Sequence, residues 1–199
     1  RPDAYSYSRF CELYRAWRQK LHPTMRFDHK AGERAFIDYA GQTLPYVDAE
    51  TGELREAQIF VAVLGASSYM YVEAQAGQDL ESWLMGHVRA FEFWRGVPEL
   101  LIVDNLKSGV RSPCRYEPEV NRSYYDLGVH YHIAVLPARV RKPRDKPKAE
   151  ASVLVVERWL IAPLRNATLV GLAGANKALG EQLERVHDRP MRHIGKSRR

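Results

Sequence analysis

The order in which strand-like and helix-like patterns follow one another limits the folds open to this chain. From residue 33 to residue 76, short β-rich segments alternate with turns, which favours an antiparallel meander of three strands. Residues 79–96 then repeat apolar side chains at helical spacing between a capping Asp79 and a terminating Gly96. The apolar run at 97–105 follows, and its continuous hydrophobicity predicts a central parallel strand buried on both faces.

The second half of the chain adds helices and one more strand. Its patterns predict a helix over 117–131, a second buried strand over 132–138, a long helix over 146–165 and a last helix over about 171–187. A meander followed by helix-connected strands folds as one mixed sheet with helices on its faces. We therefore expect an α/β fold of the ribonuclease H-like type. It has a mixed five-stranded sheet flanked by helices and extra helices at both termini, the first over about 8–21.

Positive charge is concentrated in two segments of this chain. The sequence has a formal net charge of +6, and each of the segments 139–148 and 185–199 carries six basic residues and one Asp, a local net charge of +5. Clustered Lys and Arg fit the neutralisation of phosphates better than an evenly charged surface would. The charge pattern therefore indicates a polyanionic partner such as a nucleic acid.

Several other classes of protein are disfavoured. The two cysteines, Cys11 and Cys114, lie far apart and outside any CxxC pair, so no disulfide framework or zinc site is expected. No apolar run reaches the roughly 18 residues of a membrane helix, and the sequence shows no signal peptide. The first residue is Arg1 and not Met, so we expect a fragment of a longer protein that acts in a reducing cytoplasm.

Three acidic residues fall where the predicted sheet could bring them together. Asp38 lies within the first strand, Asp104 at the carboxyl end of the central strand, and Glu150 in the first turn of the long helix. Carboxylate oxygens are the ligands that Mg²⁺ prefers, and two such ions can clamp both oxygens of an in-line phosphoryl transfer. Ordinary roles stay open as well: a turn for Asp104, a favourable charge at a helix N-terminus for Glu150, and a solvent-facing position for Asp38.

Several longer blocks resemble one known family. Similarity to the catalytic core of IstA-type transposases of bacterial insertion sequences is carried by FIDYAGQTLPYVD, HVRAFEFWRGVPELLIVDNLKSGV, HYHIAVLPAR and RKPRDKPKAEASVLVVERWL. That family belongs to the DDE transposase and retroviral-integrase superfamily. The resemblance runs from about residue 5 to about residue 190, and its most specific parts are VDNLKSGV and the RKPRDK block with the following KxE.

The resemblance implies a site, an activity and partners. Asp38, Asp104 and Glu150 would be the DDE triad and would hold two Mg²⁺ ions, for which Mn²⁺ can substitute. The implied reaction is cleavage at transposon ends and transfer of the freed 3′ hydroxyl to target DNA. The implied partners are transposon-end and target DNA, a helper AAA+ ATPase and further copies of the chain on DNA. The setting would be the cytoplasm of a bacterium, in association with the nucleoid and without a membrane.

The resemblance also divides the chain into segments. We expect an N-terminal helix and linker at 1–30, a ribonuclease H-like DDE catalytic core at 31–166, and a C-terminal helix with a basic tail at 167–199. The helix-turn-helix region and the small C-terminal β domain of the family are expected to lie outside these residues.

Basic residues near two of the acids are the candidates for contact with DNA. Lys107 follows Asp104 closely, and the others lie in the segment that leads to Glu150, namely Arg139, Arg141, Lys142, Arg144, Lys146 and Lys148. Such residues bind the phosphate backbone without reading the base sequence.

Alternatives stay open for the third acid and for the function. Asp145 and Glu157 are the main rivals of Glu150, although Asp145 suits a helix cap and Glu157 lies about two turns further along the helix. The alternative functions are a metal-dependent nuclease of the same fold, and a catalytically silent module that binds DNA or assembles on it.

Overall fold

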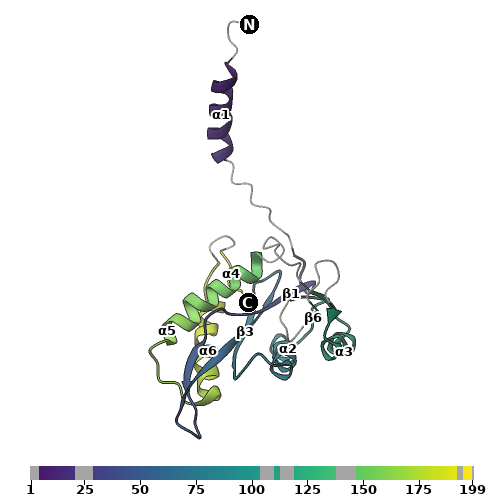
Figure 1. Ribbon diagram of the computed structural model, residues 1–199, viewed down its shortest axis with the longest axis vertical. Helices are drawn as coiled ribbons and strands as arrows, with labels where there is room; N and C mark the ends of the chain where they lie inside the picture. Colours follow the sequence, from purple (N-terminus) through teal and green to yellow (C-terminus); the bar gives the residue numbers. More distant parts are fainter. Residues whose placement is uncertain are drawn as a thin grey trace.

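A mixed β-sheet between two groups of helices forms the body of the protein (Figure 1). The computed structural model describes residues 5–20, 29–103, 110–112, 119–137, 147–191 and 195–198. One face of the sheet is covered by α4 (Pro147–Val156), α5 (Ala162–Leu164) and α6 (Gly171–Asp188), and the other by α2 (Leu80–Trp94) and α3 (Arg122–Tyr131). The expected ribonuclease H-like arrangement is confirmed.

Antiparallel strands form one half of the sheet, as the meander pattern predicts. The long strand β3 (Leu54–Leu64) pairs with β1 (Arg34–Tyr39) on one side and with β4 (Met70–Gln75) on the other. A short strand, β2 (Leu44–Val47), pairs with the first part of β3, whereas β1 pairs with its last part. The strands β1 and β2 therefore lie end to end along the same side of β3.

Parallel pairing completes the sheet. The strand β5 (Leu100–Val103) lies parallel to β1 and to β8 (Ala134–Pro137), which confirms β5 as a central strand. The sheet has six strands in the order β2-β3-β1-β5-β8, with β4 also paired to β3. This is one strand more than expected, because the chain leaves the register of β1 after Ala40 and forms β2 as a separate strand.

Two segments differ locally from their sequence patterns. The apolar run at 132–138 predicts a strand buried on both faces, but Leu136 in β8 is 53% exposed, since β8 lies at the end of the strand order. The helix expected from residue 117 begins at Arg122. Its N-cap is Asn121, whose side chain accepts a hydrogen bond from the N–H of Ser123 at 3.0 Å. Just before it, β7 (Glu119–Val120) pairs with β6 (Val110–Ser112).

Alternation along β1 separates two hydrophobic cores. Phe36 and Ala40 belong to the cluster that α4 and α6 complete, and Ala35, Ile37 and Tyr39 belong to the cluster on the α2 and α3 face. Each helix buries an apolar stripe on its own side of the sheet. The direction of every β1 side chain, including that of Asp38, follows from this division.

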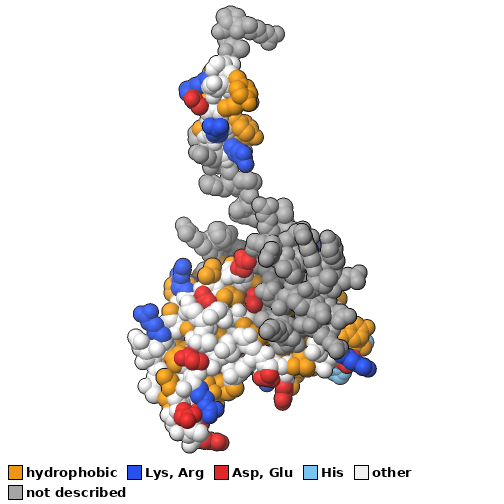
Figure 2. Space-filling model, viewed as in Figure 1, with side chains coloured by type: hydrophobic (Ala, Val, Ile, Leu, Met, Phe, Trp, Pro, Cys, Tyr) orange, Lys and Arg blue, Asp and Glu red, His pale blue; other side chains and the backbone are white. Residues whose placement is uncertain are grey.

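The remaining helices agree closely with their predicted bounds. The long helix runs through α4, a π-helical turn η2 (Glu157–Ile161) and α5, and α6 confirms the last helix. The first helix, α1 (Tyr7–Lys20), lies apart from the sheet and its helices (Figure 1), with apolar side chains along one side (Figure 2). Of the helices that the structure describes, none is both long enough and apolar enough to span a membrane.

Candidate active site

Asp38 occupies the face of β1 that α4 covers. Side chains alternate along a strand, and both Phe36 and Ala40 contact the core completed by α4 and α6. Asp38 is partly buried, and its Oδ1 accepts a hydrogen bond from the backbone N–H of Tyr39 at 2.9 Å. The strand therefore presents a carboxylate on the face that α4 covers, and its role as a metal ligand stays a prediction.

The first turn of α4 presents Glu150 to solvent while its neighbours hold the helix on the sheet. Ala149 is 2% exposed and Ser152 is 5% exposed, whereas the side chain of Glu150 is exposed. The helix α4 packs against β1 and β3. Because Glu150 makes no part of this packing, its carboxylate can take a ligand without disturbing the core.

The carboxyl end of β5 lies beside Asp38. Val103, the last residue of β5, pairs with Ile37, the residue before Asp38. The structure thus brings together β1, β5 and α4, the three elements next to or within which the predicted acids stand. Asp104 itself lies outside the described residues. So do all the basic residues predicted to contact DNA other than Lys148, namely Lys107, Arg139, Arg141, Lys142, Arg144 and Lys146. Their arrangement stays a prediction.

Of the two rivals of Glu150 as the third acid, the structure describes only Glu157. Asp145 lies outside the described residues. Glu157 lies in η2, and its Oε1 approaches Gly41, just beyond the end of β1. Glu157 therefore borders the same strand as Asp38 and stays open as a rival for the third acid.

Lys148 has an internal partner that its sequence position does not indicate. Its ammonium donates hydrogen bonds to the backbone carbonyl of Gly65 and, at 3.5 Å, to that of Ala66, both in the turn between β3 and β4. Burial lowers the pKa of this ammonium below its ordinary value. Contact between Lys148 and DNA stays a prediction, and the structure adds a role within the protein.

The donor set fits a hard divalent cation. Asp38 and Glu150 offer only carboxylate oxygens, which suit Mg²⁺ or Mn²⁺, whereas a zinc site uses nitrogen and sulfur ligands as well. Among the residues that the structure describes, no three His, Cys, Asp or Glu side chains form a group that could hold a metal ion. A site of three acids at this place therefore includes at least one residue outside the described ranges, and Asp104 stays the predicted one.

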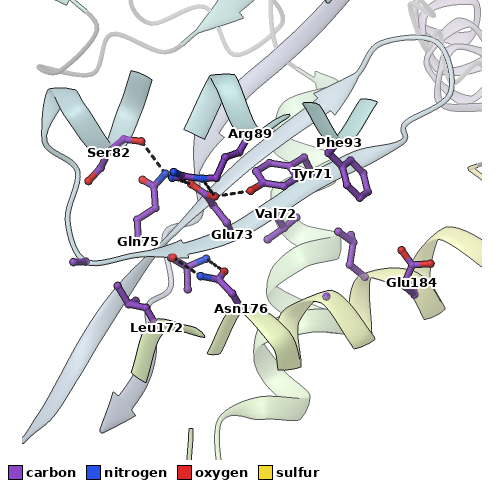
Figure 3. Close-up of a pocket in the computed structure, with 14 residues that line it drawn as sticks. Tyr71, Val72, Glu73, Gln75, Ser82, Arg89, Phe93, Leu172, Asn176 and Glu184 are labelled. Atoms are coloured by element: carbon purple, nitrogen blue, oxygen red, sulfur yellow. Dashed lines mark hydrogen bonds and ion pairs between the residues drawn. The ribbon is translucent and has the colours of Figure 1, made fainter. Parts of the chain in front are cut away.

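A second polar cluster, which the sequence patterns did not single out, joins β4 to α2 (Figure 3). Arg89 donates from Nε to Glu73 Oε2 at 2.6 Å and from Nη2 to Glu73 Oε1 at 2.7 Å. Tyr71 donates its hydroxyl to Glu73 Oε2 at 2.5 Å, and the side-chain amide of Gln75 donates to Oε1. The cluster borders a groove of about 590 Å³ between β4, α2 and α6.

This second cluster is a structural one. Burial by itself raises the pKa of the Glu73 carboxyl, but the hydrogen bonds from Arg89, Tyr71 and Gln75 outweigh it and hold the pKa below its ordinary value. A carboxylate with both oxygens occupied by donors is poorly placed to act as a base or a metal ligand. The signal that could have found it is an acid inside the apolar strand MYVEAQ, the same signal that singles out Asp38.

The chain is similar over its full length to proteins of bacterial insertion sequences. It is 48% identical over 199 residues to "Putative transposase y4uI" of Sinorhizobium fredii, covering 100% of this chain and 39% of that protein. It is 44% identical over 195 residues to "Putative transposase for insertion sequence IS1162" of Pseudomonas fluorescens, covering 98% of this chain and 35% of that protein. No family model matches the chain. The chain thus spans less than two fifths of the length of these curated relatives.

Solved structures share the fold at low sequence identity. A chain of the simian T-cell lymphotropic virus intasome has a TM-score of 0.66 and 12% identity, covering 88% of this chain and 55% of that chain. The HTLV-2 integrase catalytic core domain, solved in complex with magnesium, has a TM-score of 0.59 and 14% identity, covering 84% of this chain and 94% of that chain. The likeness establishes the fold of the chain.

Proposed function

We propose that this chain is the catalytic core of a DDE-type DNA transposase. The premise is that the chain is a homologue of insertion-sequence transposases and has the fold of retroviral integrase catalytic cores. Its reaction is the cleavage of DNA at transposon ends and the transfer of the freed 3′ hydroxyl to target DNA. The observation that carries the proposal is that β1 pairs with β5 and packs against α4. Asp38 lies in β1, Asp104 follows β5 in the sequence, and Glu150 lies in α4.

The triad in this proposal is Asp38, Asp104 and Glu150. Two Mg²⁺ ions, when bound, supply activation of the attacking hydroxyl and stabilisation of the leaving 3′ oxygen. Asp38 contributes its carboxylate from a fixed strand, and Glu150 contributes one from the exposed first turn of α4. The magnesium complex of the HTLV-2 core supports the use of a divalent metal in this fold.

DNA binding in the proposal depends on basic residues around the triad. Lys107 and the segment 139–148 neutralise the phosphates on either side of the reacting one. Several copies of the chain assemble on DNA, and a helper AAA+ ATPase takes part. Assembly of several copies is supported by the dimeric and trimeric forms of the HTLV-2 core and by the intasome that shares the fold.

A joining assay with transposon-end DNA and Mg²⁺ tests the proposal, with the full-length protein that contains this chain. The Asp104→Asn variant should lose both cleavage and strand transfer by about a thousandfold or more, the scale for a residue on which the chemistry depends. Asp126→Asn is the matched control, since Asp126 is an exposed acid on α3. Retained joining by Asp104→Asn would exclude the assigned triad.

The same assay separates the two alternative functions. Cleavage by the wild type without any joining would identify a metal-dependent nuclease. DNA binding without either reaction would identify a silent module.

A further inference from the structure

The turn between β3 and β4 is held in place by neighbours on three elements. The N–H of Gly65 donates to the carbonyl of Arg34 in β1 at 2.8 Å. The ring of Tyr69 stacks on Phe93 of α2, with centroids 5.3 Å apart, and lies against His187 of α6, with centroids 4.2 Å apart. The turn is therefore a fixed part of the domain independently of α4.

Gly65 leaves little room for a side chain in this turn. A Cβ at this position would lie 3.1 Å from the Arg34 carbonyl oxygen and 3.2 Å from the Cβ of His29. The backbone of the turn thus approaches the start of β1 closely. The N–H of Gly65 is also hydrogen-bonded to the carbonyl of Arg34, so the backbone on both sides of Gly65 is held in place. The direction of the Gly65 carbonyl is therefore fixed.

Lys148 reaches that carbonyl from the first turn of α4. Successive residues of a helix are rotated by about 100°, so Lys148 and Glu150 lie about 200° apart and point to nearly opposite sides of α4. Ala149, between them, is buried in the core. One polar contact and one apolar contact therefore set both the depth and the rotation of the turn that carries Glu150.

We propose that Lys148 is a positioning residue for Glu150, and that its bond to the β3–β4 turn sets the first turn of α4 before DNA binds. The inference rests on the proposed function, in which Glu150 is a metal ligand. It gives Lys148 a task that differs from that of the other basic residues in the segment 139–148. In the proposed function those residues bind phosphate, whereas the partner of Lys148 belongs to the protein itself.

Three possible roles of Lys148 predict different effects of Lys148→Met on metal binding without DNA. If only its charge matters, removing a cation near the site strengthens metal binding, because like charges repel. If Lys148 contacts only phosphate, metal binding without DNA is unchanged. If Lys148 positions Glu150, metal binding becomes weaker, and the sign of the effect separates the three roles.

The first experiment is a titration of the DNA-free protein with Mn²⁺, followed by the electron paramagnetic resonance signal of the free ion. Lys148→Met should weaken Mn²⁺ binding about tenfold, the scale for residues that orient a metal ligand. Lys148→Arg, which keeps the donor, should retain most of the affinity. Lys177→Met, which removes an exposed cation from α6, is the control and should change nothing. Unchanged or tighter binding in Lys148→Met overturns the inference.

A second measurement, amide hydrogen exchange in the metal-free protein, is independent of the metal site. Lys148→Met should raise the exchange rates of residues 151–153 about tenfold and leave those of β1 and β3 unchanged. Unchanged exchange at 151–153 overturns the inference whatever the Mn²⁺ result. If the wild type binds no Mn²⁺ at all, the proposed metal site is wrong, and the exchange rates alone decide whether Lys148 fixes the turn.

Discussion

At the scale of residues, two acids within apolar strands lie on opposite faces of the sheet. Glu73 lies on the face of the sheet covered by α2, where Arg89, Tyr71 and Gln75 occupy its carboxylate oxygens. Its side chain is 7% exposed. Asp38 lies on the face covered by α4, beside the end of β5. An acidic residue in an apolar strand is therefore structural at position 73 and a proposed metal ligand at position 38.

The pairing of Glu73 predicts a pH-dependent stability. Its pKa is below the ordinary value of 4.5, so the carboxylate stabilises the fold above that pH, and the contribution is lost as the pH falls through the lower folded-state pKa. The urea midpoint of the wild type should fall as the pH drops below about 4.5. Glu73→Gln should reduce this fall. At pH 7 it should cost about 1–3 kcal/mol, since Arg89 then loses a charged partner.

Urea denaturation at pH 7, 4.5 and 3.5 measures this effect. Glu50→Gln, at an exposed position in a turn, is the control for the change from carboxyl to amide. Parallel pH dependences of the wild type and Glu73→Gln would contradict the prediction.

At the scale of elements, α6 protects the edge of the sheet. The side chain of Asn176 accepts from the N–H of Ala74 at 2.7 Å and donates to its carbonyl at 2.9 Å. Further along α6, His187 Nε2 accepts from the N–H of Met70 at 3.2 Å. Burial lowers the pKa of His187 to about 4, so the ring is neutral at pH 7 and can accept. The outer N–H of Met70 and both outer backbone groups of Ala74 are thus paired with helix side chains, which protects the edge from pairing with another chain.

Removing the bonds from Asn176 to the edge of β4 should lower stability and increase self-association. Asn176→Ala leaves the N–H and the carbonyl of Ala74 without their partner, which should lower the free energy of unfolding by about 2–3 kcal/mol. Urea denaturation gives the stability, and size-exclusion chromatography gives the association. Lys177→Ala, on the exposed side of the same helix, should change neither. A loss below about 0.5 kcal/mol in Asn176→Ala would show that these bonds are not needed.

Elements with strong periodicity could be predicted from the sequence, and their partners could not. The apolar run before Asp104 identifies β5 as central, and α2 and α6 follow from their repeats and end signals. The exposure of β8 was missed because the hydrophobicity of a strand does not give its place in the sheet order. The bond from Lys148 to Gly65 joins residues 83 positions apart, and no local pattern signals such a contact.

At the scale of the whole molecule, basic residues are concentrated in the segment 139–148 of the sequence. Over the described surface shown in Figure 2, acidic and basic side chains are interspersed. The segment 139–148 carries a net charge of +5 within a chain of net charge +6. Binding to DNA through this segment should therefore depend strongly on salt.

Replacing Arg141, Lys142 and Arg144 together by Gln should reduce the slope of the logarithm of the DNA-binding constant against the logarithm of salt concentration. The reduction should be about 2–3, because each lost phosphate contact contributes roughly 0.9. Fluorescence anisotropy over a salt series measures the slope. The matched control replaces three exposed cations elsewhere, Arg95, Arg122 and Lys177, by Gln. Equal slopes for the two triple variants would show that the segment is not the DNA contact.

The arrangement of the acids is tested most directly by anomalous diffraction from crystals that contain Mn²⁺. The proposed site predicts Mn²⁺ within about 2.2 Å of carboxylate oxygens of Asp38, with Asp104 and Glu150 as the other protein ligands. Mn²⁺ bound by Asp38 and Glu157 would contradict the assignment of Glu150 as the third acid. Mn²⁺ bound only away from Asp38 would contradict the site as a whole.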